Sequence, residues 1–464
     1  MAGLGTALAC ARDGHDVTIL ERDATPMPES ADAAFWWERR GAPQVRHSHA
    51  FLARAHNLLR DRAPDVLADL LEAGATEMPF TAALPPTLTD QLPRPGDEDL
   101  VALACRRTTF EWVLRRAVLA QPGVELRDGI AVEHLDAVPG DPPRVVGVAG
   151  LDADLVVDAR GPRSSSDSWL AAIGATPVVE ELHESGIVYL SRFYRLTGGA
   201  AAHARGRQAP STAAVDLGYL KYAVFVGDRD TFSITYAVDA HDDELRRTLA
   251  QPDAFEAATR PLVAAAPWRV PGVSEPITDV HVMAGLRNRY RPLLVDDTPI
   301  VHGYLAVGDA SMCTNPLYGR GCSLALVHAF GLADALHAHG ADLDTLARDF
   351  AAFTERELVP WFRSAVAQDE QARMQATGEE LPPEDPRAFV QEIFRDGLLP
   401  ALRTSPIVFR AFLRWFNLLS TPDALMNDPE IINEVLAAYQ DRENRPVPEP
   451  FGPADRAEFV AQLA

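Results

Sequence analysis

The sequence of 464 residues is poor in several features, and each scarcity excludes a class of protein. Lysine occurs only at Lys221, so almost all of the 43 basic residues are arginine, and 66 acidic residues outnumber them. The resulting net charge of −23 argues against nucleic acid or an anionic membrane surface as a partner. The sequence has no apolar run of 18 residues and no signal-peptide pattern, so we expect neither a membrane span nor secretion.

Cysteine is scarce as well. Four cysteines lie far apart and form no Cys-x-x-Cys pair: Cys10, Cys105, Cys313 and Cys322. This pattern predicts reduced thiols in a cytoplasmic protein and no metal site. The sequence has no internal repeats. Apart from the dinucleotide-binding pattern described below, it has no nucleotide-binding fingerprint. What remains is an ordinary globular composition, 47% hydrophobic and 23% charged, in a chain long enough for two or three domains.

One stretch combines a carboxylate, a rigid loop and a helix start. An apolar strand is expected over Tyr304–Val307, followed by Gly308-Asp309, a loop with Pro316, and a helix from about Gly321. Glycines let backbone N–H groups approach a ligand, and a helix N-terminus favours negative charge. The combination suits a cofactor with hydroxyl-bearing and anionic parts. The alternative is an ordinary strand, turn and helix.

The N-terminal residues follow the order of a dinucleotide-binding unit from its helix onward. Helical spacing over Leu4–Ala11 ends at Gly14, and a buried strand follows over Val17–Leu20. Gly3 then matches the third glycine of Gly-x-Gly-x-x-Gly, and Glu21, with Arg22 beside it, lies where an acid binds the adenosine ribose. The first strand and the first two glycines of that unit have no counterpart in the sequence.

Two further segments carry candidate ligand-binding residues. An amphipathic helix beginning near Cys105 holds Arg107 four residues before Glu111, a spacing that by itself predicts a surface ion pair; the other role of Arg107 is implied by the resemblance given below. A later strand ends in Asp158-Ala159-Arg160-Gly161. The run Gln44-x-Arg46-His47-x-His49 by itself predicts a helix cap with solvated imidazoles; the resemblance given below implies instead that Arg46 or His49 lies near a cofactor or substrate.

Together these segments resemble the group A flavoprotein monooxygenases, the para-hydroxybenzoate-hydroxylase-like and squalene-epoxidase-like enzymes. The run at Gln44–His49 resembles actinobacterial FAD-dependent oxygenases and polyether epoxidases. The resemblance implies FAD as cofactor and an α/β fold: a Rossmann-type FAD-binding domain, an inserted antiparallel-sheet substrate domain and a C-terminal helical region. The FAD contacts that it implies, in chain order, are Gly3, Glu21, Arg22, Arg107, Val132, Asp309, Pro316, Gly319 and Gly321.

Each implied contact has a place along the cofactor. Arg107 would bind the diphosphate, the backbone near Val132 the adenine, and Asp309 the ribityl and pyrophosphate region. Pro316 and Gly319–Gly321 would lie beside the isoalloxazine ring. In the family the residue at Asp158 helps to organise the flavin and NAD(P)H sites; Arg160 stands where a small hydroxyl residue is commoner, which weakens the NAD(P)H inference.

The pattern also predicts domain boundaries. The FAD-binding domain would comprise residues 1–180 and 281–342, the substrate domain 181–280 and the helical region 343–464. Alternating strands are expected at 188–195, 222–226 and 231–236, a loop at 198–212 and a helix over 253–265. Arg192, Tyr194 and Tyr236 would either face the substrate or pack in the core. Phe409, Phe412, Leu413, Phe416 and Leu419 would form core or an apolar tunnel.

By this resemblance the protein is an FAD-dependent oxidoreductase, a monooxygenase that hydroxylates or epoxidises an apolar small molecule through a flavin C4a-hydroperoxide. NAD(P)H would be a transient electron donor, or a separate flavin reductase would serve. No side chain is singled out as a catalytic acid, base or nucleophile. Two alternatives stay open: a flavin-dependent double-bond reductase of the prenyl-reductase kind, and a flavin-free binding protein. A halogenase is disfavoured because its Trp-x-Trp-x-x-Pro segment is missing.

The absence of the first strand leads to a further expectation about the N-terminus. In a doubly wound sheet that strand is central, so its loss exposes two strand edges and an apolar slot. We expect Met1 to be an internal methionine of a Gly-x-Gly-Met-Ala-Gly loop, preceded by an apolar strand. If the chain truly begins at Met1, it should bind FAD poorly or not at all.

Overall fold

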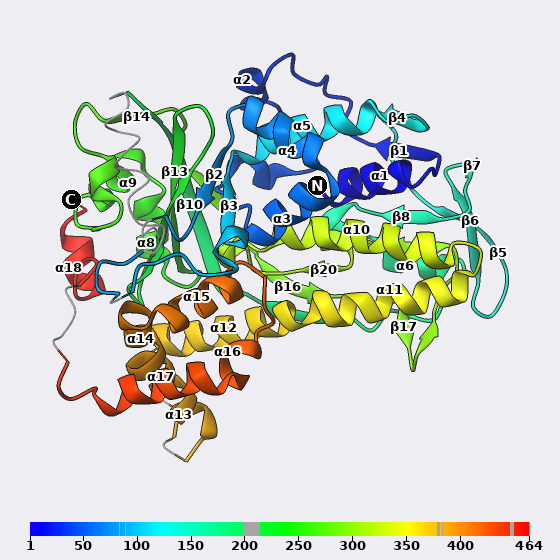
Figure 1. Ribbon diagram of the computed structural model, residues 1–464. Helices are drawn as coiled ribbons and strands as arrows, with labels where there is room; N and C mark the ends of the chain where they lie inside the picture. Colours follow the sequence, from blue (N-terminus) through cyan, green and yellow to red (C-terminus); the bar gives the residue numbers. More distant parts are fainter. Residues whose placement is uncertain are drawn as a thin grey trace.

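The structure is a computed structural model that describes residues 1–82, 84–88, 90–197, 214–377, 381–382, 384–445 and 450–463. Figure 1 shows three regions: parallel strands next to long helices, an antiparallel sheet beside them, and a group of helices in the lower part of the view. The loop expected at 198–212 lies outside the described residues.

The first half of the chain alternates helices with short strands. Its elements are α1 (Ala2–Arg12), β1 (Val17–Glu21), α2 (Ala31–Ala34), α3 (Ala53–Arg62), α4 (Pro64–Glu72), β2 (Thr76–Pro79), β3 (Val101–Ala104), α5 (Arg107–Leu119), β4 (Val124–Asp128), β5 (Leu135–Val138), β6 (Arg144–Val148), β7 (Leu151–Asp152), β8 (Val156–Asp158) and α6 (Ser166–Ala172). The short helix α2 lies between β1 and α3, and its residues Ala31 and Ala34 are buried.

The parallel strands form two separate pairs. β1 pairs with β4, with Val17 opposite Val124, and β8 pairs with β19 (Tyr304–Ala306), with Val156 opposite Tyr304. No strand of the described residues joins the two pairs. They enclose the cavity described below.

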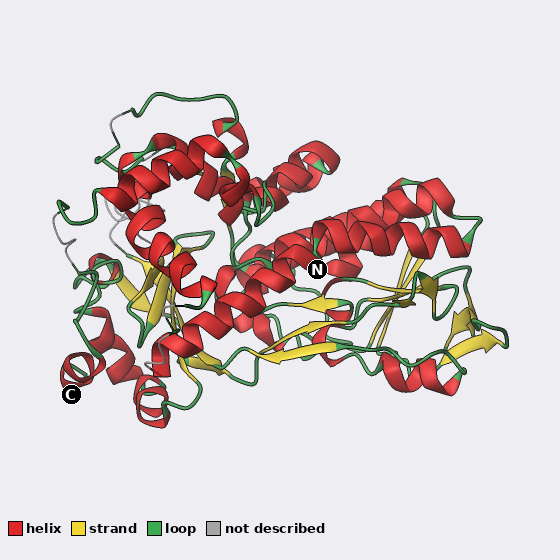
Figure 2. Ribbon diagram, turned by 90° about the horizontal axis from the view of Figure 1, so that it is seen from below, coloured by secondary structure: helices red, strands yellow, loops and turns green. Residues whose placement is uncertain are grey.

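Long helices cover these strands on one side (Figure 2). After β19 the chain forms β20 (Met312–Cys313), α10 (Gly321–His339) and α11 (Leu343–Glu357). α1 crosses α10 closely, since a Cβ on Gly5 would lie 3.1 Å from the Cβ of Ala329. α10 is long and apolar enough to cross a membrane by length and composition, but 72% of its most apolar window is buried inside the protein. It is the central packing element.

The antiparallel sheet is built from the middle of the chain. Its elements are β10 (Ile187–Leu196), β11 (Ala214–Asp216), β12 (Lys221–Val226), β13 (Thr231–Asp239), α8 (Asp243–Leu249), α9 (Pro252–Thr259), β14 (Ser274–Pro276) and β15 (His281–Met283). The order is β11-β12-β13-β10-β14, and β15 pairs with another part of β10. The helix expected over Asp253–Ala265 ends at Thr259, with Arg260 as its C-cap, because Pro261 has no backbone N–H to continue the helical hydrogen bonds.

Side chains alternate between the two faces of this sheet. Tyr194 and Tyr236 point into a core cluster with Leu190 and Phe255, and Arg192 pairs with Glu256 at 2.8 Å. The three residues considered for substrate contact therefore pack in the core. Their neighbours occupy the opposite face, toward the N-terminal region: Tyr189, Ser191, Ser233 and Thr235.

Short strands connect the sheet to α10. They are β9 (Glu181–Glu184) with β16 (Arg287–Tyr290) and β17 (Leu294–Val295) with β18 (Thr298–Pro299). The last third is helical: α12 (Val359–Thr377), α13 (Pro386–Ile393), α14 (Leu399–Thr404), α15 (Pro406–Phe416), α16 (Ala424–Asn427), α17 (Pro429–Gln440) and α18 (Arg456–Ala461).

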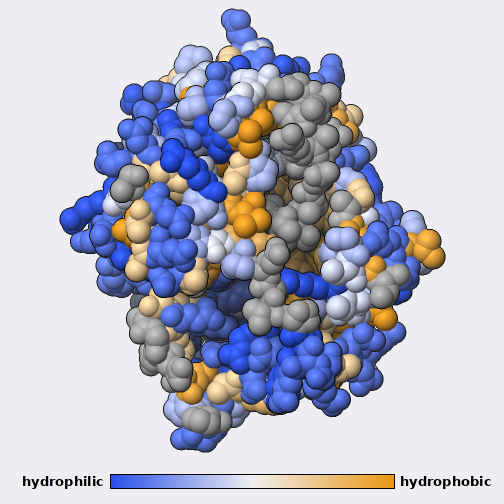
Figure 3. All heavy atoms as spheres, turned by 90° about the vertical axis from the view of Figure 1, so that its left-hand side faces the viewer, coloured by the Kyte–Doolittle hydropathy of each residue, from blue (hydrophilic) through white to orange (hydrophobic). Residues whose placement is uncertain are grey.

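The C-terminal helices bury the aromatic residues of the last third. Phe409 and Leu413 pack against Phe80 and Leu100, and Phe416 and Leu419 lie against the same cluster, so the core interpretation is confirmed for these four residues of the apolar stripe. α18 lies apart from the other C-terminal helices and packs Phe459 into the core of the antiparallel sheet. On the face that carries this sheet, polar side chains predominate and apolar ones form small patches (Figure 3).

Candidate functional site

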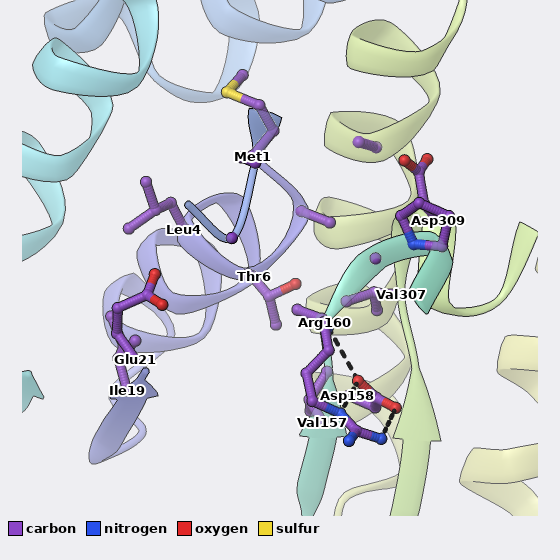
Figure 4. A pocket seen from close by; sticks show the side chains of 18 of the residues that line it. Met1, Leu4, Thr6, Ile19, Glu21, Val157, Asp158, Arg160, Val307 and Asp309 are labelled. Carbon is purple, nitrogen blue, oxygen red and sulfur yellow. Dashed lines mark hydrogen bonds and ion pairs between the residues drawn. The ribbon is translucent and has the colours of Figure 1, made fainter. Parts of the chain in front are cut away.

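A cavity of about 1990 Å³ lies between the parallel strands, α1 and the start of α10. It has about twice the volume of the largest ordinary ligand pockets, which reach roughly 1,000 Å³. Figure 4 shows Ile19 and Glu21 of β1 on one side and Val157 and Asp158 of β8 on the other.

The structure brings together every residue that the sequence assigns to cofactor binding. The residues come from six separate segments of the chain, and all of them line this one cavity: Gly3, Glu21, Arg22, Arg107, Val132, Asp309, Pro316, Gly319 and Gly321.

The segment from residue 308 to residue 321, here called the fingerprint loop, needs glycine at two positions. Gly308 and Gly319 have φ angles of +57° and +66°, which side chains disfavour. A Cβ at Gly308 would lie 2.6 Å from the Cβ of Ala2, and one at Gly319 would lie 2.7 Å from the Cβ of Ala50. The loop is therefore pressed against α1 on one side and against residue 50 on the other.

Arg107 is buried at the cavity wall. Its guanidinium contacts Glu111 Oε2 at 3.4 Å and Cys322 Sγ at 3.1 Å, and its Nε has no hydrogen-bond partner. The ion pair with Glu111 thus forms, but inside the protein, so the surface-pair interpretation is wrong. Burial disfavours the Glu111 carboxylate, yet Arg107 and Arg39 outweigh this effect and lower the pKa of Glu111 to about 2.

Arg39 is a site residue that sequence reasoning missed. It donates to Glu21 Oε2 at 3.1 Å and to Glu111 Oε1 at 2.8 Å, so it links the acid of β1 to α5. Arg115 lies beside it, and both guanidinium groups rest on the ring of Trp37. Arg39 NH1 and Arg115 Nε are buried without hydrogen-bond partners. Arg39 follows a long loop with no periodic signal, which is why the sequence did not indicate it.

Asp309 faces the cavity near the N-terminal end of α10 (Figure 4). Burial raises the pKa of its carboxyl group, and Arg107 partly opposes this shift. No hydrogen bond to its side chain is formed by the described residues. The carboxyl group is therefore ready to accept hydrogen bonds from a ligand's hydroxyl groups.

Asp158 is not available to a ligand. Its carboxylate accepts hydrogen bonds from Arg160 at 3.0 Å, Ser164 at 2.5 Å and Tyr304 at 2.8 Å. Burial opposes ionisation, but these donors lower the pKa of Asp158. Arg160 also stacks on the ring of Trp169, with its guanidinium carbon 3.5 Å from the ring centroid. Arg160, and not Asp158, presents its charge to this part of the cavity.

The segment with Arg46, His47 and His49 also lines the cavity. His49 Nδ1 contacts the carbonyl of His47 at 2.9 Å, and burial lowers the pKa of His49 to about 3. His47 is 8% exposed, and burial, with His281 nearby, lowers its pKa to about 4. His47 is buried and His49 is half-buried at the cavity wall, so the interpretation as a solvated helix cap is wrong.

A chain of hydroxyl groups connects this segment to the antiparallel sheet. His47 Nδ1 contacts Ser191 Oγ at 3.1 Å, and Ser191 contacts Thr235 at 2.8 Å. Ser48 contacts Thr235 at 2.6 Å and Ser233 at 2.7 Å. We call these five residues the hydroxyl chain. The alternation of β10 and β13 puts Ser191, Ser233 and Thr235 on one face, but the sequence does not reveal which face meets a cavity.

No protein-family model matches the sequence. Protein Rv3254 of Mycobacterium tuberculosis (strain ATCC 25618 / H37Rv) is 28% identical over 451 residues, which cover 91% of this chain and 88% of that protein.

Solved structures of flavin enzymes have a similar fold. p-Nitrophenol 4-monooxygenase PnpA from Pseudomonas putida DLL-E4 has a TM-score of 0.59 and 18% identity, covering 91% of this chain and 96% of its own. The flavin-dependent brominase Bmp2 has a TM-score of 0.56 and 16% identity, covering 95% and 97%. PqsL, a probable FAD-dependent monooxygenase from Pseudomonas aeruginosa, has a TM-score of 0.53 and 17% identity, covering 84% and 96%. These likenesses confirm the predicted α/β fold class.

Proposed function

We propose that this protein is an FAD-dependent monooxygenase that transfers oxygen to a small molecule. The observation that carries the proposal is the convergence of all nine predicted cofactor contacts on one cavity. The fold, which the chain shares with flavin-dependent monooxygenases, supports it.

The cavity walls fit the parts of FAD. Buried nitrogen atoms without partners on Arg107, Arg39 and Arg115 suit the diphosphate, because an unpaired buried donor is costly until an anion accepts from it. Glu21, held by Arg39, suits the adenosine ribose, and Arg22 and Val132 line the same end. The carboxyl group of Asp309 suits the ribityl hydroxyl groups.

The ring end of the cofactor would lie where the fingerprint loop meets α10. Pro316 and Gly319 give a rigid wall, and the N-terminus of α10 at Gly321 places the positive end of a helix dipole there. Bound FAD would supply the redox chemistry, taking up electrons and activating O₂. The protein's own residues would bind it, orient it and exclude water.

The domain organisation follows the same proposal. Residues 1–180 and 281–342 would bind FAD, residues 181–280 would form the wall on the substrate side, and residues 343–464 would support both. NAD(P)H would act as a transient electron donor, with a separate flavin reductase as the alternative. The four cysteines are free thiols, which fits a cytoplasmic location.

The edges of β1 and β8 line the cavity, and neither has a strand partner on that side among the described residues.

The first experiment is reconstitution with FAD. The purified chain is mixed with excess FAD, desalted and examined by visible absorbance. We expect a retained flavin spectrum and substrate-dependent O₂ uptake with NADPH. A colourless protein after reconstitution would exclude the proposal and leave a flavin-free binding protein.

Two other flavin activities are separated by the same assay. A double-bond reductase would oxidise NADPH with an unsaturated substrate without consuming O₂. A halogenase would need halide for product formation, and the fold likeness to Bmp2 is the reason to include bromide. Product mass spectrometry distinguishes the gain of oxygen, of two hydrogens or of bromine.

A further inference from the structure

The short sheet β9–β16–β20 turns one face toward the cavity. Arg289 of β16 lies between Leu182 of β9 and Cys313 of β20, and all three residues line the cavity. Because side chains alternate along a strand, Asn288 and Tyr290 point the other way, where they hydrogen-bond to α12 and α11. Arg289 therefore places a guanidinium group on the cavity side of this sheet.

Arginine recurs at every second residue of this segment, and two of the three arginines have acidic partners. Arg287 pairs with Glu184 at 2.8 Å, and Arg291 pairs with Glu180 at 3.0 Å. Arg289, between them, forms no ion pair with any residue that the structure describes. The sequence pattern is the same at all three positions, so only the fold separates the unpaired cation from the paired ones.

The half-buried guanidinium of Arg289 has few contacts within the protein. Its one side-chain hydrogen bond to a described residue runs from NH2 to the carbonyl of Asp309 at 3.3 Å, and its Nε is buried without a partner. Burial, and then the charge of Arg291, lower the pKa of Arg289. A partly buried cation without a counter-charge costs free energy, which a bound anion would offset. The whole chain carries a net charge of −23, so this cation does not reflect a general surplus of positive charge.

The position of Arg289 separates it from the arginines proposed to bind the FAD diphosphate. It contacts the start of the fingerprint loop at Asp309, which faces the cavity (Figure 4). The later part of that loop, at Pro316, is the proposed wall of the flavin ring. Met283 and Leu286 line the cavity from the segment before β16 and add apolar surface. This part of the cavity thus combines one unpaired cation with apolar walls.

We propose that Arg289 binds the anionic group, a carboxylate or a phosphate, of a molecule that lies beside the flavin ring. The inference rests on the proposed function and refines its ligands. A guanidinium group donates two parallel hydrogen bonds to such a group, and the apolar walls hold the rest of the molecule. Two molecules carry the required chemistry: an acidic substrate with an apolar body, and NADPH through its 2′-phosphate.

The test uses the FAD-reconstituted protein and pairs of probes that differ in one anionic group. The pairs are benzoate with benzamide, 2-naphthoate with 2-naphthamide, and NADP⁺ with NAD⁺. Calorimetric titration measures the dissociation constants, so the readout does not depend on the flavin. Hydrogen bonds to a charged group are strong, and we expect the anionic member of at least one pair to bind about 10-fold more tightly or better. If no anionic member is preferred, the proposal is wrong.

Variants identify the group responsible for the preference. Arg289→Gln removes the charge, so the preference should fall to about 1-fold, whereas Arg289→Lys keeps the charge without the fork and should retain part of it. Arg287→Gln is the matched control, because it removes the same charge from the same strand but from a cation that Glu184 already pairs. Its preference should equal that of the parent protein. An unchanged preference in Arg289→Gln, or an equal loss in Arg287→Gln, would overturn the proposal.

The same titrations name the source of the anion. A loss in Arg289→Gln confined to the acid and amide pairs supports an acidic substrate, and a loss confined to NADP⁺ supports the 2′-phosphate. The Kd for FAD should stay within about 2-fold in Arg289→Gln. A rise of about 10-fold would show that Arg289 binds the phosphates of FAD itself and would overturn the proposal. Failure of the parent protein to bind FAD would instead count against the proposed function, and the titrations of the FAD-free protein would still measure the anion preference.

Discussion

At the scale of single residues, Arg107 gives the sharpest test of cofactor binding. Its Nε is buried without a partner, whereas Arg116 on the same helix is exposed and rests on Trp112. Loss of a hydrogen bond to a charged group costs about 1.5–3 kcal/mol. We therefore expect Arg107→Ala to raise the Kd for FAD about 10- to 100-fold in fluorescence titrations.

The matched control for this prediction is Arg116→Ala, which removes the same charge from the solvent side of α5. Its Kd for FAD should stay within about 2-fold of the parent value, since exposed charges contribute little. Equal losses in both variants would mean that net charge, and not the cavity wall, governs binding.

A substitution at Gly319 tests whether the fingerprint loop needs glycine there, and a second substitution at Ala50 should restore part of the lost stability. Its positive φ and the 2.7 Å approach to the Cβ of Ala50 predict that Gly319→Ala destabilises the protein by about 1–3 kcal/mol. Ala50→Gly removes the atom that the new Cβ would meet. In the double variant, urea unfolding should show recovery of part of the loss. Additive losses would indicate that backbone strain alone, and not the contact, is responsible.

At the scale of elements, a buried ion pair joins α5 to the turn between β12 and β13. Arg106 at the start of α5 donates to both carboxylate oxygens of Asp228, at 2.8 and 2.6 Å, and Thr109 adds a third bond. Asp228 has no exposed surface. The pair connects the helix that carries Arg107 to the antiparallel sheet, so it positions two walls of the cavity relative to each other.

Removing one partner of this pair should be costly. We expect Asp228→Ala to lower the free energy of unfolding by about 3–5 kcal/mol, because Arg106 is left as an unpaired buried charge. Glu125→Ala, which breaks the exposed pair with Arg127, should cost less than about 1 kcal/mol. Urea unfolding of both variants at pH 7 measures the contrast. A loss below 1 kcal/mol for Asp228→Ala would contradict the inferred role.

The same pair predicts a pH dependence. Burial alone would raise the pKa of Asp228, but hydrogen bonds and charge from Arg106 lower it below its usual value. A carboxyl group with a lowered pKa in the folded state stabilises the protein fully above its unfolded pKa of about 4. This contribution is lost as the pH falls through the folded pKa. Asp228→Ala should therefore show a shallower loss of stability below pH 4 than the parent protein.

The helices and strands also show how much of the fold could be predicted from the sequence. Helices and strands were predictable where period and punctuation agree, as for α1 with Gly14, β1 and α10. The face of the antiparallel sheet that meets the cavity was not, because both faces of β10 are buried and carry polar and apolar residues alike. Arg39 was missed for a related reason: its partners Glu21 and Glu111 are brought to it only by the fold.

At the scale of the whole molecule, the cavity predicts that the cofactor is part of the stability of the fold. The cavity separates the pair β1–β4 from the pair β8–β19. Four arginines in its walls, Arg39, Arg107, Arg115 and Arg289, each have a buried guanidinium nitrogen without a hydrogen-bond partner. A ligand that spans these walls links elements that the described chain leaves apart. FAD should therefore bind the folded state and not the unfolded one.

Because FAD binding is thermodynamically linked to folding, the size of this stabilisation can be calculated from the FAD concentration and the Kd. A ligand at 100 times its Kd stabilises the folded state by about 2.7 kcal/mol, and the gain grows with the logarithm of its concentration. Thermal unfolding followed by circular dichroism should thus show a Tm that rises steadily with FAD. In Arg107→Ala the same rise should require about 10- to 100-fold more FAD, since that is the predicted change in Kd. A Tm that does not change with FAD, while FMN or riboflavin raises it, would place the stabilising contacts at the ring and not at the arginine-lined end of the cavity.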